Sequence, residues 1–129
     1  MHEFSTMSSI VTTVLEEGKK HNAMAITRVV LNIGELTFLG EEQLRFAFQV
    51  LSEDTLLDGA ELVINRIPPQ VTCSCGYEGD VEYEEKEDFH IRFPLLRCPK
   101  CGGSVHVQHG RECLIKHIEI ERDDVPAAG

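Results

Sequence analysis

The sequence is short of positive charge: 12 Lys and Arg residues stand against 22 Asp and Glu residues, which gives a formal net charge of −10. A protein that neutralises phosphates needs a basic patch. The cysteine-containing region carries an acidic run instead, made of Glu78, Asp80, Glu82, Glu84, Glu85, Glu87 and Asp88. We therefore expect no nucleic acid partner, whereas an acidic surface favours metal cations or basic protein surfaces.

Long apolar runs are also missing. No segment approaches the roughly 20 apolar residues that cross a bilayer, and the start of the chain lacks the charged-then-apolar pattern of a secretory signal. We expect a cytoplasmic protein without membrane association, in which cysteine thiols stay reduced and available to metal.

The sequence also lacks the common motifs of catalytic sites. The sequence contains no His-Glu-x-x-His, no nucleophile elbow and no phosphate-binding loop. A site closed by four thiolates would leave no open coordination position for a catalytic water. We therefore expect a binding protein and not an enzyme.

Cysteine does not occur before residue 73, and four of the five cysteines then form two pairs, Cys73-x-Cys75 and Cys98-x-x-Cys101. Four soft thiolates suit Zn²⁺ in a closed structural site. Gly102 and Gly103 after the second pair let backbone N–H groups point at sulfur atoms. A disulfide pair or an exposed redox motif are the alternatives, although a redox motif would need only one pair. The fifth cysteine, Cys113, is expected to be a small buried hydrophobic residue.

Apolar periodicity predicts an α+β fold. Helical spacing indicates helices from Ser5 to about His21, with Ser5 or Thr6 as the cap, and over residues 41–51. Alternation predicts strands over residues 27–33, 60–67 and 113–121. The expected fold class is a small sheet of about three strands with two helices, plus an inserted zinc-ribbon-like module with four cysteine ligands.

These patterns also predict the domain organisation. Residues 1–70 together with 111–121 form the expected α+β domain, because the last alternating segment is too long for a ribbon's own strand. Residues 71–110 form the metal-binding domain, and residues 122–129 a flexible tail. A module of about forty residues seldom folds on apolar burial alone, so metal binding is expected to be part of its folding free energy.

His2 is a candidate ligand at the opposite end of the chain. The α-amine of Met1, the amide nitrogen that follows and the His2 imidazole can close two fused chelate rings, with Glu3 completing a plane. Square-planar nitrogen donors select Ni²⁺ or Cu²⁺ over Zn²⁺. The plainer alternative is a solvated terminal histidine without a role.

The chain combines several distinctive segments with the cysteine pairs: Met1-His2-Glu3, Ile33-Gly34-Glu35-Leu36, Leu44-Arg45-Phe46-Ala47-Phe48 and Gly59-Ala60-Glu61-Leu62. Together they resemble the HypA/HybF family, the nickel metallochaperones of nickel-iron hydrogenase maturation. The resemblance runs from residue 1 to about Glu121, and the first cysteine pair departs from the family's common Cys-x-x-Cys.

The resemblance implies a nickel-binding domain and a zinc domain. Ni²⁺ would be transient cargo at the amino terminus, bound by Met1 through its amine or backbone, by His2 and by Glu3. His90 is a further candidate ligand, although a surface or strand histidine is the plainer interpretation. Structural Zn²⁺ would be held by the family's zinc ligands, which match Cys73, Cys75, Cys98 and Cys101.

The resemblance further implies the partners: a HypB-type GTPase and the precursor of the hydrogenase large subunit, which receives the nickel. A different function class stays open beside it, an acidic zinc-ribbon adaptor in transcription or translation. The negative charge and the Met-His-Glu start argue against the adaptor.

Overall fold

The computed structural model describes residues 2–86 and 91–122. Its helices and strands follow in the order α1 (His2–Lys20), β1 (Ala25–Gly34), the short 3-10 helix η1 (Glu35–Thr37), α2 (Glu41–Ser52), β2 (Glu61–Ile67), β3 (Gln70–Thr72), β4 (Glu78–Asp80), β5 (Tyr83–Lys86), β6 (Ile91–Pro94), β7 (His106–His109) and β8 (Cys113–Glu121). In this part of the chain, no helix is both long enough and apolar enough to span a membrane.

The described residues divide into two compact units. The first comprises residues 2–32, 39–65 and 114–122, and the second comprises Ile33–Phe38 and Arg66–Cys113. The predicted division at residues 70 and 111 stays a prediction about domains, and all of the predicted tail except Arg122 lies outside the described residues.

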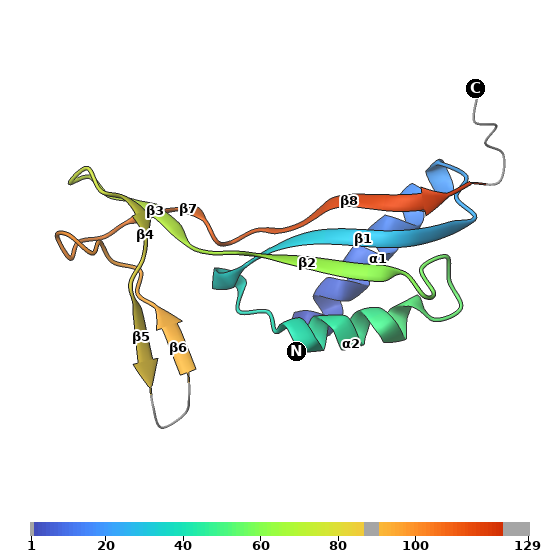
Figure 1. The fold of residues 1–129 in the computed structure, drawn as a ribbon, viewed down its shortest axis with the longest axis horizontal. Helices are drawn as coiled ribbons and strands as arrows, with labels where there is room; N and C mark the ends of the chain where they lie inside the picture. Colours follow the sequence, from blue (N-terminus) through green and yellow to red (C-terminus); the bar gives the residue numbers. More distant parts are fainter. Residues whose placement is uncertain (1, 87–90, 123–129) are drawn as a thin grey trace. The chain divides into compact units, whose positions relative to one another are not determined.

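The first unit is built on a three-stranded sheet in the order β2-β1-β8 (Figure 1). At one end of the β1–β8 pair, Met24 N–H donates to the carbonyl of Glu121 at 2.7 Å. At the other end, Gly34 N–H donates to the carbonyl of Glu112 at 2.7 Å, so the two strands run antiparallel. This sheet and the two helices confirm the predicted α+β class.

Helix α1 begins at His2 and not near Ser5 as predicted. The Ser5 hydroxyl lies inside the helix and donates to the carbonyl of His2 at 3.2 Å, so neither Ser5 nor Thr6 is the cap. The apolar face that the sequence indicated is correct, because Met7, Ile10 and Val14 are all buried. Our prediction missed the first turn, in which Phe4 lies three residues before Met7 at helical spacing.

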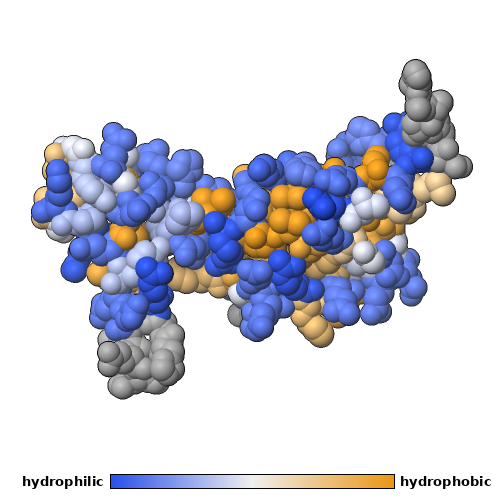
Figure 2. All heavy atoms as spheres, viewed as in Figure 1, coloured by the Kyte–Doolittle hydropathy of each residue, from blue (hydrophilic) through white to orange (hydrophobic). Residues whose placement is uncertain are grey.

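Helix α2 buries one aromatic side chain and exposes another. Phe48 is 6% exposed, beside the buried Leu44 and Ala47, whereas Phe46 is 66% exposed. Phe46 therefore does not belong to the apolar core, although it lies in a helix predicted from apolar periodicity. Residues two apart in a helix lie on different faces, so Phe46 stands away from the stripe that buries Leu44 and Phe48. Figure 2 shows one face of the molecule, with apolar side chains gathered over part of the β1–β2 region.

This difference predicts the result of two matched substitutions. Phe48→Ala removes a buried ring and should lower the free energy of unfolding by about 3–5 kcal/mol. Phe46→Ala removes an exposed ring and should change it by about 0.5 kcal/mol or less. Chemical denaturation of both variants measures the two values. Equal losses would contradict the exposed position of Phe46.

The second unit holds two small antiparallel sheets. One has the order β4-β3-β7, with Val71 opposite both Gly79 and Val107. The other is the β5–β6 hairpin, in which Glu84 pairs with Phe93. Val71 is 1% exposed and Val81 is 6% exposed, so the apolar core of this unit is small.

Segment Ile33–Phe38 belongs to this second unit although it precedes α2 in sequence. Leu36 N–H donates to the carbonyl of Gly110 at 2.7 Å, and the Tyr83 hydroxyl donates to Glu35 Oε2 at 2.8 Å. A Cβ atom at Gly34 would lie 1.9 Å from the Gly110 carbonyl oxygen, so this backbone approach requires glycine.

Candidate metal centre

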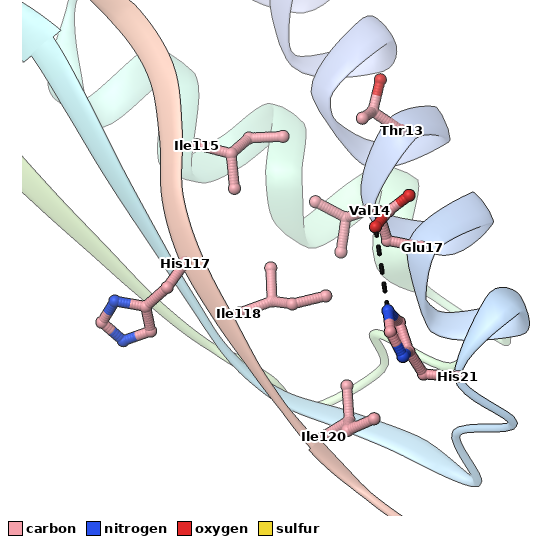
Figure 3. Close-up of a pocket in the computed structure, with 8 residues that line it drawn as sticks. All are labelled: Thr13, Val14, Glu17, His21, Ile115, His117, Ile118 and Ile120. Carbon is pink, nitrogen blue, oxygen red and sulfur yellow. Dashed lines mark ion pairs between the residues drawn. The ribbon is translucent and has the colours of Figure 1, made fainter.

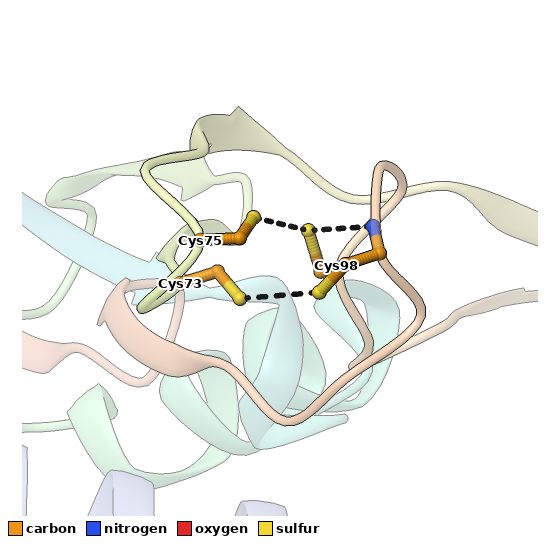
Figure 4. Close-up of side chains that lie close together, drawn as sticks. Cys73, Cys75 and Cys98 are labelled. Carbon is orange, nitrogen blue, oxygen red and sulfur yellow. Dashed lines mark hydrogen bonds between the residues drawn. The ribbon is translucent and has the colours of Figure 1, made fainter.

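The two cysteine pairs converge on one point of the second unit (Figure 4). Their four sulfur atoms all lie within 4.8 Å of one another. The Sγ atoms of Cys73 and Cys101 are 3.6 Å apart, as are those of Cys75 and Cys98. A tetrahedral site with Zn–S bonds of about 2.3 Å has sulfur–sulfur edges near 3.8 Å. The spacing fits a tetrahedral cation and is far longer than the roughly 2.05 Å of a disulfide.

Backbone geometry explains how the second pair presents its sulfur atoms. Cys98 is 2% exposed, and its sulfur accepts hydrogen bonds from Lys100 N–H at 3.3 Å and Cys101 N–H at 3.4 Å. Gly103 N–H donates to the Cys101 sulfur at 3.4 Å, as the glycines after this pair predicted. The turn closes through Gly102 N–H, which donates to the Cys98 carbonyl at 2.9 Å.

These contacts favour the thiolate form of Cys98, which is the form that binds metal. Burial raises the pKa of this thiol, but the N–H groups of Cys101 and Lys100, together with the thiols of Cys75 and Cys101, outweigh burial and lower it to about 6. Cys75 differs: Tyr77 N–H lowers its pKa, but the neighbouring thiols Cys98 and Cys73 raise it overall to about 11. The four sulfur atoms thus compete for protons, and a bound cation would relieve that competition.

The first pair achieves its turn with one intervening residue. Cys73 N–H donates to the carbonyl of Tyr77, and Gly76 N–H donates to the carbonyl of Cys73, both at 2.9 Å. Gly76 has a φ of +101°, which glycine adopts without steric cost. Gly76, with its positive φ, therefore closes the turn of the shorter cysteine pair.

Cys113, the fifth cysteine, is exposed at the start of β8, so the prediction of a buried residue was wrong. The pattern predicted the strand correctly but not which residues of it are covered. Cys113 is not part of the quartet.

The predicted amino-terminal ligands lie in the first turn of α1. His2 is exposed, and the carboxylate of Glu3 accepts a hydrogen bond from Gly40 N–H at 2.9 Å. Met1 and His90 lie outside the described residues. The hydrogen bond between Gly40 and Glu3 fixes the start of α1 against the start of α2. No sequence pattern predicted this bond, because Glu3 and Gly40 are 37 positions apart.

A groove of about 490 Å³ lies between α1 and β8 in the first unit. Figure 3 shows Ile115, Ile118 and Ile120 pointing toward α1, while His117 points away from it. The charged groups of the groove do not converge on a point, since His21 Nε2 pairs only with Glu17 Oε1 at 4.0 Å. The groove is mainly apolar, and among the residues that the structure describes its side chains form no cluster of metal ligands.

A sequence model of the family described as "Hydrogenase/urease nickel incorporation, metallochaperone, hypA" matches residues 1–120. The chain belongs to the HypA family. The resemblance seen in the sequence is thereby confirmed, and with it the broad function of nickel incorporation in hydrogenase maturation. This function replaces the alternative hypothesis of a zinc-ribbon adaptor in transcription or translation.

Relatives in the HypA family match over almost the whole chain. The hydrogenase maturation factor HypA of Methanothermobacter thermautotrophicus is 44% identical over 125 residues, which cover 96% of this chain and 100% of that protein. Its counterpart in Methanocella arvoryzae is 37% identical over 121 residues, or 94% and 99% of the two chains.

Solved HypA structures share the fold. The Ni metallochaperone HypA from Helicobacter pylori has a TM-score of 0.61 at 25% identity, over 94% of this chain and 98% of that chain. A second HypA solution structure has a TM-score of 0.66 at 26% identity, over 95% and 98% of the two chains.

Proposed function

We propose that this chain carries Ni²⁺ at its amino terminus and delivers it, with a HypB-type GTPase, to the precursor of the hydrogenase large subunit in the cytoplasm. Nickel would be bound by Met1 through its amine or backbone, by His2 and by Glu3, with His90 as a further candidate. Zn²⁺ on Cys73, Cys75, Cys98 and Cys101 would be structural. The family's role in nickel incorporation carries the proposal.

The start of α1 supports amide coordination at His2 and Glu3. The first N–H groups of an α-helix have no intrahelical acceptor, and α1 begins at His2. Nickel can therefore replace the protons of these amides without breaking a helical hydrogen bond. The Glu3 carboxylate is already engaged with Gly40 N–H, which favours the backbone nitrogen of Glu3 over its side chain as donor.

The two sites differ in how readily they would exchange metal. Cys98 is buried among hydrogen-bond donors, and four thiolates fill a tetrahedral zinc shell, so that site is closed. His2 is exposed on the first turn of a helix, where a partner can reach the bound ion. A closed site that holds structure and an open site that releases cargo are what a carrier needs.

Nickel affinity should fall as the pH falls. An amide must lose its proton and the His2 imidazole must be neutral to bind, so acid competes with the metal at both donors. Each proton released on binding weakens the affinity about tenfold for a drop of one pH unit. Isothermal titration calorimetry at two pH values one unit apart measures this, and an unchanged affinity would exclude amide ligands.

A further inference from the structure

Two aromatic side chains of the first unit stand in solvent beside the proposed nickel site. Phe4 on α1 is 49% exposed and Phe46 on α2 is 66% exposed. They line a groove of about 350 Å³. We call it the α1–α2 groove, and its lining residues are Glu3, Phe4, Glu42, Gln43, Phe46 and Ala47.

The charge of the α1–α2 groove is negative. Glu3 and Glu42 are its ionisable residues, and no cation lines it among the residues that the structure describes. The neighbouring Arg45 is engaged elsewhere, because its guanidinium bonds Glu41 at 3.0 Å and the carbonyl of Leu62 at 2.7 Å. The groove thus combines two exposed phenyl rings with an acidic rim.

This combination is complementary to one kind of partner. Exposed aromatic rings beside a concave surface mark interaction sites, and they bury a large side chain of a partner favourably. Carboxylates on the rim attract lysine or arginine, and such cations also bind well over phenyl faces. A second copy of this chain would bring the same carboxylates and a net charge of −10 against the groove, so it fits poorly.

We propose that the α1–α2 groove docks a basic segment of a partner protein, whose large apolar side chain inserts between Phe4 and Phe46. This inference rests on the proposed nickel site, because Glu3 lies in both the groove and that site. Docking would place the partner's basic segment against the turn that carries His2. The partner would then lie beside the bound nickel.

The test is a nuclear magnetic resonance titration of the full chain, labelled with nitrogen-15 and free of nickel. The probe is an amphipathic helical peptide of leucine and lysine, about four turns long, and its counterpart has glutamate at every lysine. We expect the lysine peptide to shift the amide signals of Phe4, Glu42, Gln43 and Phe46. The glutamate peptide should bind at least about tenfold more weakly.

Two matched variants separate docking from general attraction to an acidic protein. Phe46→Asn should weaken binding at least about tenfold, the scale of one buried phenyl side chain. Asn and Phe have similar helix propensities, so α2 should persist. Phe38→Asn is the control, because Phe38 is 68% exposed in the second unit and lies outside the groove. It should leave the affinity unchanged.

Several outcomes would overturn the inference. Shifts elsewhere, no shifts at all, or equal effects of Phe46→Asn and Phe38→Asn would show that the groove is not the docking site. A dimer that Phe46→Asn converts to a monomer, seen by sedimentation, would assign the groove to a second copy. Nickel titration of the same variants tests the carrier function separately, since neither substitution touches a proposed ligand.

Discussion

An extension of several residues ahead of Met1 should abolish the tightly bound nickel equivalent, and His2→Ala should do the same. The extension converts the α-amine of Met1 into an amide and moves the terminal amine out of the chelate rings, whereas a single added residue would let the new amine, two amides and the His2 imidazole close another chelate. His2→Ala removes the imidazole. Loss of groups that only orient a metal ligand already costs about 10–100-fold in affinity, so loss of a ligand should cost at least about 100-fold.

Metal analysis and calorimetry of the untagged protein measure this effect. Both variants should keep about one zinc per chain, because the cysteine quartet lies in the second unit. His21→Ala is the matched control, since His21 is an exposed histidine just after α1 and pairs only weakly with Glu17 at 4.0 Å. Nickel that binds both variants as tightly as the unaltered chain would refute a terminal site.

Cys98→Ser should release the proposed structural zinc and unfold the second unit. Cys98 is the most buried member of the quartet and accepts two backbone hydrogen bonds at its sulfur. Structural zinc sites contribute apparent binding free energies of about 10–16 kcal/mol. The apolar core around Val71 and Val81 is too small to replace such a contribution.

Hydrogen exchange resolved by residue would show this loss. Amides of β3, β4 and β7 should lose protection, while those of α1 and β1 keep it, and zinc content should fall from about one equivalent toward zero. Cys113→Ser provides the control, because Cys113 is an exposed cysteine outside the quartet. A Cys98→Ser protein with full zinc content and unchanged protection would show that the quartet is not the structural site.

The sequence predicted elements with strong periodicity and missed features set by distant contacts. The strand over residues 113–121 was correct at both ends because the segment is rich in isoleucine and alternates from Ile118 to Glu121. The start of α1 was wrong by three residues, since Phe4 in its first turn is exposed and was not counted with the buried apolar face. The exposure of Cys113 depends on what covers β8, which local pattern does not encode.

At the candidate metal centre, too, local sequence patterns were predictive and contacts between distant residues were missed. Spacing alone brought the four cysteines together, because paired thiols a few residues apart have few other uses. The hydrogen bond from Gly40 N–H to Glu3 joins residues 37 positions apart and could not be read from either segment. Phe46 could have been recognised as exposed, because it falls between Leu44 and Phe48 on the wrong side of the helix.

Segment Ile33–Phe38 has a consequence for how the cysteine-containing unit can be inherited. Its Glu35 accepts from Tyr83, and its Leu36 N–H donates to Gly110, so residues encoded before α2 complete a unit encoded after β2. Excising residues 66–113 as a cassette would therefore leave Tyr83 and Gly110 without these partners. Gene fusion or exchange of this unit between proteins should succeed only when the short segment after β1 travels with it.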